Sequence, residues 1–154
     1  YGDNELTNQL LENKDIDLNV IGNCGKTILH HPNIENNEEL AINLLEKGAD
    51  PTICDKDGNN FLLKAALKGK HGESILKTAV RLGCNLNTKV SNKNSILMEV
   101  MFAFSKIPSH ESDRRDELKS IAKRLINYGI DTKAINMQNE TVLFELVRLC
   151  DIEG

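Results

Sequence analysis

The chain has 154 residues, of which 40% are hydrophobic, 27% are charged and 4% are aromatic, and it contains no tryptophan. This composition is typical of a globular protein whose core is built from aliphatic side chains. The formal net charge of −4 argues against a nucleic-acid partner. No apolar run is long enough to span a membrane, and no signal peptide is visible, so membrane insertion is not expected.

The first stretch, residues 1–21, predicts a single helix followed by a turn. Leu6, Leu10 and Leu11 have helical spacing. The helix that would precede this one in a two-helix unit is missing. The stretch is therefore either the remainder of a longer array or an atypical N-terminal cap.

The next segment predicts a tight turn followed by two helices. The turn Asn23-Cys-Gly25 contains the glycine that such turns need, and Thr27-Ile-Leu-His30 then opens a helix. Pro32 lacks a backbone donor and clashes one turn back. The first helix is therefore predicted to be short or displaced within a hairpin at Leu29–Lys47.

Two longer helical hairpins are predicted, at Phe61–Leu82 and Ile96–Tyr128. In the second hairpin, one buried face is predicted for each helix: Leu97, Val100, Met101 and Phe104 on the first, and Leu118, Ile121, Ala122, Leu125 and Ile126 on the second. Phe102 is left facing outward. The charged segment Lys106–Glu117 between these helices is predicted to be an exposed, mobile loop that folding does not require. A last helix is expected from Thr141, and no sheet is expected beyond the turns.

The spacing of these segments is constant in one half of each unit. The same 12 positions separate a helix-ending glycine from the start of the next helix in three places: Gly48 to Asn60, Gly83 to Ser95, and Gly129 to Thr141. All variation in length falls between the two helices of a unit. Stacked repeats explain this pattern, because neighbours must keep one geometry whereas a loop on one face can lengthen.

The segments Thr27-Ile-Leu-His30 and Gly48-Ala-Asp50 resemble the ankyrin repeat, whose signature is Thr-Pro-Leu-His-x-Ala within a period of about 33 residues. The resemblance covers nearly the whole chain. It implies an all-α, ankyrin-repeat solenoid of stacked helix-turn-helix units with β-turn fingers, as a single domain over residues 1–154. The units would be a partial repeat at 1–21, repeats at 22–54, 55–89 and 90–135, and a partial repeat at 136–154.

No motif in the sequence indicates catalysis, a cofactor or a metal site. Nucleotide-binding, zinc-protease and serine-hydrolase signatures are absent from it. His30 matches the ankyrin histidine, and the resemblance implies that this side chain bonds to the backbone of the neighbouring repeat. The four cysteines form no Cys-x-x-Cys pair, and stacked repeats would hold them on separate layers, too far apart to bridge, which predicts reduced thiols.

The resemblance further implies that a partner binds to the finger tips and to the concave face of the first helices. Carried over by spacing, the finger positions are Asn23, Cys24, Lys26, Lys56, Asp57, Asn59, Ser91, Asn92, Asn94, Met137, Gln138 and Glu140. The concave positions, each seven residues after a helix start, are Ile34, Leu67, Phe102 and Arg148. An apolar stripe that ends in a cation suits an amphipathic or extended peptide, with Phe102 as its main anchor. The alternative is that the stripe is only packing between repeats.

Two functions are consistent with this reading. The first is a protein–protein interaction module, expected to be a monomer, within a larger scaffold or effector protein. The second is the targeting or regulatory region of an enzyme whose catalytic domain lies outside these residues. Catalysis within the chain is not expected in either case. The expected compartment is the cytoplasm, or the host cytosol if the protein is a secreted bacterial effector.

Overall fold

The computed structural model describes residues 4–152, and its description leaves out the side chains of residues 4, 8 and 149–152. The helices are α1 (Asn4–Leu11), α2 (Pro32–Glu35), α3 (Glu38–Glu46), α4 (Phe61–Leu67), α5 (Glu73–Arg81), α6 (Ile96–Lys106), α7 (Ser112–Asn127) and α8 (Val142–Ile152). Short 3-10 segments are η1 (Asn23–Gly25), η2 (Ile28–His30), η3 (Gly69–Gly72) and η4 (Ser91–Lys93). No β-strand occurs in residues 4–152, so the predicted all-α class is confirmed.

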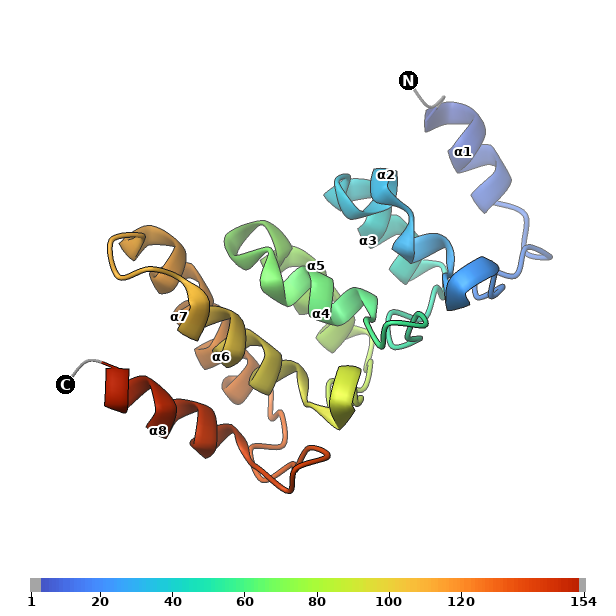
Figure 1. The fold of residues 1–154 in the computed structure, drawn as a ribbon. Helices are drawn as coiled ribbons and strands as arrows, with labels where there is room; N and C mark the ends of the chain where they lie inside the picture. Colours follow the sequence, from blue (N-terminus) through green and yellow to red (C-terminus); the bar gives the residue numbers. More distant parts are fainter. Residues whose placement is uncertain (1–3, 153–154) are drawn as a thin grey trace.

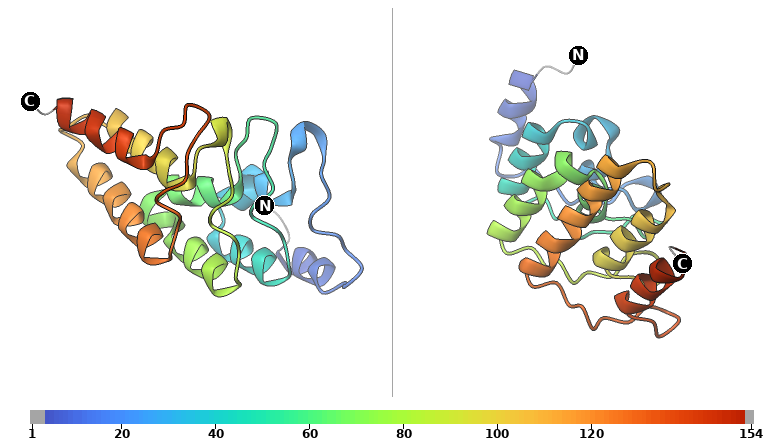
Figure 2. Two further views of the ribbon diagram at one scale, coloured as in Figure 1. Left: turned by 90° about the horizontal axis from the view of Figure 1, so that it is seen from below. Right: turned by 90° about the vertical axis from the view of Figure 1, so that its left-hand side faces the viewer.

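The helices form two layers in an elongated stack (Figure 1). An inner layer contains α2, α4, α6 and α8, and an outer layer contains α1, α3, α5 and α7 (Figure 2). Contacts run along the layers, between α4 and α6, α6 and α8, and α3 and α5, and across them, between α4 and α5 and between α6 and α7. Each helix pair therefore packs on the pairs before and after it.

An aliphatic core fills the space between the layers. Its fully buried side chains include Leu29, Leu62, Ile75, Ile96, Val100, Leu118 and Leu125. Met101 and Phe104 are buried, at 8% and 5% exposed, whereas Phe102 between them is 43% exposed. The predicted orientation of these three side chains on α6 is confirmed.

Three outer helices end in the same way. Gly48, Gly83 and Gly129 follow α3, α5 and α7 with φ of 99°, 76° and 82°. After each glycine, the next residue donates its N–H to a carbonyl five positions back: Ala49 to Leu44, Cys84 to Ala79, and Ile130 to Leu125. This is the Schellman ending, which the left-handed conformation of glycine permits.

Four finger turns connect the units: finger 1 (residues 22–26), finger 2 (55–59), finger 3 (90–94) and finger 4 (136–140). In each finger the first residue donates its backbone N–H to the carbonyl of the last, at 2.8–3.1 Å: Gly22 to Lys26, Asp55 to Asn59, Val90 to Asn94, and Asn136 to Glu140. The fingers project side by side on the side of the inner layer (Figure 2).

Two kinds of finger alternate along the stack. In fingers 2 and 4, the Oδ1 atoms of Asp55 and Asn136 each accept two backbone N–H groups of the turn. In fingers 1 and 3, two successive residues have positive φ: Cys24 and Gly25, and Asn92 and Lys93. The backbone N–H of finger 2 donates to finger 1, from Lys56 to Cys24, and finger 4 donates to finger 3, from Met137 to Asn92. Main-chain hydrogen bonds thus join finger 1 to finger 2 and finger 3 to finger 4.

The first unit departs from a regular hairpin, as Pro32 predicted. The chain forms η2, stops, and starts again as the four-residue helix α2 with Pro32 at its first position. His31 caps α2, because its side chain accepts the N–H of Asn33. Ile34 consequently does not lie seven residues along one continuous helix from Thr27. It turns inward and is 7% exposed, so its prediction as a concave surface residue is wrong.

The prediction of a loop over Lys106–Glu117 is also wrong. Helix α6 extends to Lys106 and α7 begins at Ser112, so only residues 107–111 connect them. The charged side chains of this segment form tertiary contacts. Arg114 donates to the carbonyl of Leu67, and Arg115 donates to the carbonyl of Ile107 while its guanidinium lies 4.4 Å from the Phe104 ring centroid. These contacts hold the first turns of α7 against α4 and α6.

The burial of Leu125 gives a direct test of the register of α7. Leu125 is 0% exposed, whereas its neighbour Ile126 is 51% exposed, contrary to its predicted place on the buried face. Leu125→Ala is expected to lower the free energy of unfolding by about 2–5 kcal/mol, because it leaves a cavity. Ile126→Ala should change that free energy by less than about 0.5 kcal/mol. Urea unfolding followed by circular dichroism measures both, and similar losses would contradict this register.

A second prediction concerns Gly72, where the η3–α5 junction lies against the backbone of α4. A Cβ at Gly72 would lie 1.8 Å from the carbonyl oxygen of Ala65. Gly72→Ala is expected to destabilise the protein by at least about 2 kcal/mol, because the backbone of α4 or α5 must move. Gly83→Ala is the matched control. A Cβ added at Gly83 would have no neighbouring atom within 4 Å. Only the positive φ of this residue should therefore lower the stability, by about 1 kcal/mol. Thermal denaturation that ranks the two in the opposite order would contradict this account.

Candidate functional site

A groove lies where fingers 2, 3 and 4 meet the inner helices α6 and α8. We call it the finger groove. Its lining residues are Asp57, Asn59, Ser91, Asn92, Asn94, Met98, Glu99, Phe102, Asn136, Gln138, Glu140, Thr141, Glu145 and Arg148. The fingers form one wall, and the exposed faces of α6 and α8 form the floor.

The finger groove brings together many of the predicted partner-binding residues. These are Asp57, Asn59, Ser91, Asn92, Asn94, Phe102, Gln138, Glu140 and Arg148. Asn23, Cys24, Lys26 and Lys56 are exposed on fingers 1 and 2 but do not line it, and neither does the exposed Met137 of finger 4. Most of the predicted finger residues are therefore exposed, and those of fingers 2 to 4 largely share one surface.

The predicted concave stripe is only partly formed. Phe102 and Arg148 share the finger groove. Ile34 lies in the core, and Leu67 is half-buried against it. The inter-repeat packing alternative therefore holds for the first two positions, and the exposed part of the stripe is confined to α6 and α8.

Sequence reasoning missed several residues of the groove floor. Glu99 precedes Phe102 by three positions on α6, and Glu145 precedes Arg148 by three positions on α8. Residues three apart share a helix face. Applying the same helical spacing one turn earlier would have found both carboxylates.

Carboxylates dominate the charge of the finger groove. Arg148 is the one basic side chain in its lining, and it pairs with Glu140 at 2.8 Å and with Glu145 one turn before it. Glu99 accepts a hydrogen bond of 2.6 Å from the side-chain amide of Asn94. The remaining carboxylate, Asp57, is exposed at the tip of finger 2. The groove can therefore offer acceptors and an aromatic ring to a ligand.

His30 positions one wall of this groove. Its Nδ1 atom accepts the backbone N–H of Thr27 at 3.1 Å, so the proton resides on Nε2, which donates to the carbonyl of Asn59 at 3.1 Å. The ring is buried, at 2% exposed. The prediction that this histidine bonds to the backbone of the next unit is confirmed. It acts by holding finger 2 and does not itself line the groove.

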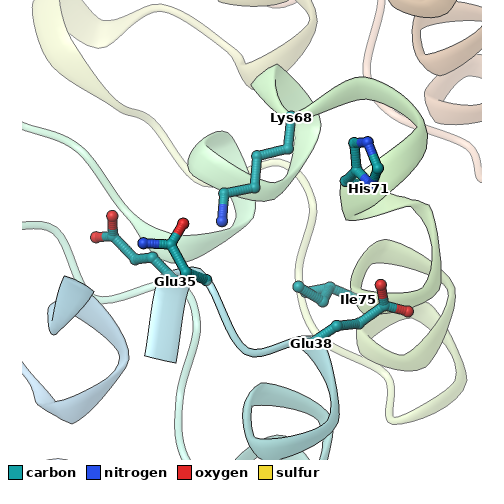
Figure 3. A pocket seen from close by; sticks show the side chains of 6 residues that line it. Glu35, Glu38, Lys68, His71 and Ile75 are labelled. Atoms are coloured by element: carbon teal, nitrogen blue, oxygen red, sulfur yellow. The ribbon is translucent and has the colours of Figure 1, made fainter. Parts of the chain in front are cut away.

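A second hollow lies at the other end of the helices, between the first and second units. Glu35, Asn36, Glu38, Lys68, His71 and Ile75 line it, and Figure 3 shows Glu35 and Glu38 on the α2–α3 side of it and Lys68, His71 and Ile75 on the α4–α5 side. The carboxylate of Glu35 is already paired with Lys64. No group of three or more metal-binding side chains occurs in the described part of the chain. This hollow therefore has less to offer a ligand than the finger groove.

The cysteines differ in their surroundings. Cys24, Cys54 and Cys84 are free thiols; Cys24 is exposed and the other two are half-buried. Burial raises the pKa of the Cys54 thiol, and the nearby charge of Asp55 raises it further. Burial and then Asp50 raise the pKa of Cys84 in the same direction. Both groups therefore favour the neutral thiol.

These differences predict an order of thiol reactivity. In a Cys150→Ser background, Cys24 should react first with Ellman's reagent, because it is exposed. Cys54 and Cys84 should react more slowly near neutral pH, since the thiolate is the nucleophile, and should speed up as the pH is raised toward their elevated pKa. Mass spectrometry of the labelled peptides gives the order. Equal rates at all three sites near neutral pH would contradict the described burial.

Comparison with known proteins finds neither a protein-family model nor a curated protein that matches this chain. In residues 4–152, no helix is both long and apolar enough to cross a membrane. The functional argument therefore starts from the finger groove itself.

Proposed function

We propose that this chain is an ankyrin-repeat region that binds a protein or peptide partner in the finger groove. The observation that carries the proposal is the composition of that groove. Three fingers and two inner helices surround Phe102, an aromatic ring that is 43% exposed. Protein recognition surfaces typically combine a central aromatic anchor with a polar rim.

Three features support the assignment to ankyrin repeats. The finger turns share one closing hydrogen bond, the outer helices share one ending, and His30 bonds across to Asn59 of the next finger. Stacked repeats require such constant junctions, because each unit buries its apolar face only against its neighbours.

The chemistry of the groove favours a protein over other partners. Four carboxylates line it with a single arginine, a charge balance that repels the phosphates of nucleic acid. We place this monomeric module in the cytosol, where thiols stay reduced, because the described cysteines are free.

The proposal predicts that Phe102 dominates binding. Short random peptides displayed on phage are selected against the wild-type protein, and the selected peptides are titrated calorimetrically. The Phe102→Ala variant should bind these peptides more weakly, by about 2 kcal/mol or more, roughly thirtyfold, because aromatic anchors carry most interface energy. The thermal stability of this variant should change little, since the Phe102 ring is half exposed in the wild-type protein.

Ile126→Ala provides the matched control. Ile126 is a similarly exposed apolar side chain, but it lies on the outer helix α7. Its truncation should leave peptide affinity unchanged. Recovery of peptides that bind both variants as tightly as the wild-type protein would place the binding surface outside the finger groove and refute the proposal.

A further inference from the structure

The floor of the finger groove contains more hydrogen-bond acceptors than donors. The side-chain amide of Asn94 donates to Glu99, so its carbonyl oxygen Oδ1 faces away from that carboxylate. This oxygen is buried and has no hydrogen-bond partner in the described part of the chain. An unmet buried acceptor costs about 1–3 kcal/mol. The region beside Glu99 therefore has an excess of acceptors over donors.

The carboxylates of the groove fall into two sets. Arg148 pairs with both Glu140 and Glu145 on the side of α8, which leaves one negative charge there. Glu99 on α6 and Asp57 on finger 2 form no ion pair within residues 4–152. The lining of the groove on the side of α6 and fingers 2 and 3 therefore contains two carboxylates that no ion pair among the described residues compensates.

The aromatic ring beside Glu99 already accepts a cation. The Nζ atom of Lys106 lies 3.9 Å from the centroid of the Phe102 ring. Phe102 and Glu99 are three positions apart on α6 and line the same groove. A planar guanidinium can donate to a carboxylate with its edge and stack on an aromatic ring with its face. Glu99 and Phe102 together offer both contacts.

We propose that the partner enters the finger groove as an extended, basic segment, with an arginine between Glu99 and Phe102. The guanidinium donates to the Glu99 carboxylate and stacks on the Phe102 ring, and Asp57, which also lines the groove, attracts the next basic residue. An acidic or phosphorylated segment would meet Asp57, Glu99, Glu140 and Glu145 at close range, so the charge balance excludes it. This inference rests on the proposed function of the groove and adds the chemical class of its partner.

The peptides selected against the wild-type protein test this inference. They should be enriched in arginine and lysine, and replacing their arginines by citrulline, the neutral isostere, should weaken binding at least roughly tenfold. Binding should also weaken with added salt, because exposed charges are screened.

Variants of the protein locate the effect. Glu99→Gln keeps the acceptor for Asn94 but removes the charge, and it should lower affinity for the selected peptides roughly fivefold. Asp57→Asn should act in the same direction. Asp116→Asn, an exposed carboxylate on the outer helix α7, should leave affinity unchanged. Circular dichroism melting curves confirm that each variant is folded.

The outcomes separate this inference from the proposed function. Peptides that require Phe102 but are neutral or acidic, or that bind Glu99→Gln as well as the wild-type protein, would overturn the basic partner and leave the groove as the binding site. Peptides that do not require Phe102 would overturn both. Basic peptides that lose affinity in Phe102→Ala and in Glu99→Gln, but not in Asp116→Asn, are the expected result.

Discussion

The closure of the finger turns is the constraint on which the rest of the structure depends. A turn that leaves an outer helix and enters the next inner helix must satisfy its own backbone groups. Each finger does so with the same bond between its first and last residues. The number of residues between helix end and helix start is therefore fixed, which explains the 12 positions from Gly48 to Asn60 and at both later junctions.

This constraint also decides where the units can differ in length. Between the two helices of a unit no such bond is shared, and the extra residues are placed there. The second unit accommodates them as η3, and the third as a long α7 with a connection at residues 107–111. In both cases the added segment packs against a neighbour, because Gly72 touches α4 and Arg114 bonds to Leu67.

The sequence was sufficient to predict the helices whose apolar periodicity is regular. The hairpins of α4 with α5 and of α6 with α7 follow the predicted ranges closely, and the outward orientation of Phe102 followed from the burial of Met101 and Phe104. The prediction failed where the local composition indicated a loop but tertiary contacts stabilise a helix. The charges of residues 112–117 were typical of a loop, but two arginines bind carbonyl groups of other segments and extend α7.

The candidate site was predictable in its outline and not in its electrostatics. Finger positions follow directly from repeat spacing, so Asp57, Asn92 and Gln138 could be named in advance. Ile34 could not be placed correctly, since the restart of the helix at Pro32 changes its register. The pairing of Arg148 with two glutamates, and the unmet oxygen of Asn94, depend on side-chain conformations that spacing does not specify.

The two helices that form the floor of the finger groove differ in how deeply they are buried. Leu97 and Met98 of α6 are 1% and 3% exposed, whereas Leu143 and Phe144, at the corresponding positions of α8, are 62% and 50% exposed. Helix α6 is covered on both sides, but α8 packs mainly on α6. Local opening is cheapest where few apolar contacts are lost. A ligand that bridges α6 and α8 therefore ties the less buried helix to the more buried one. Opening of α8 then also breaks contacts with the ligand, so bound ligand slows amide hydrogen exchange in α8.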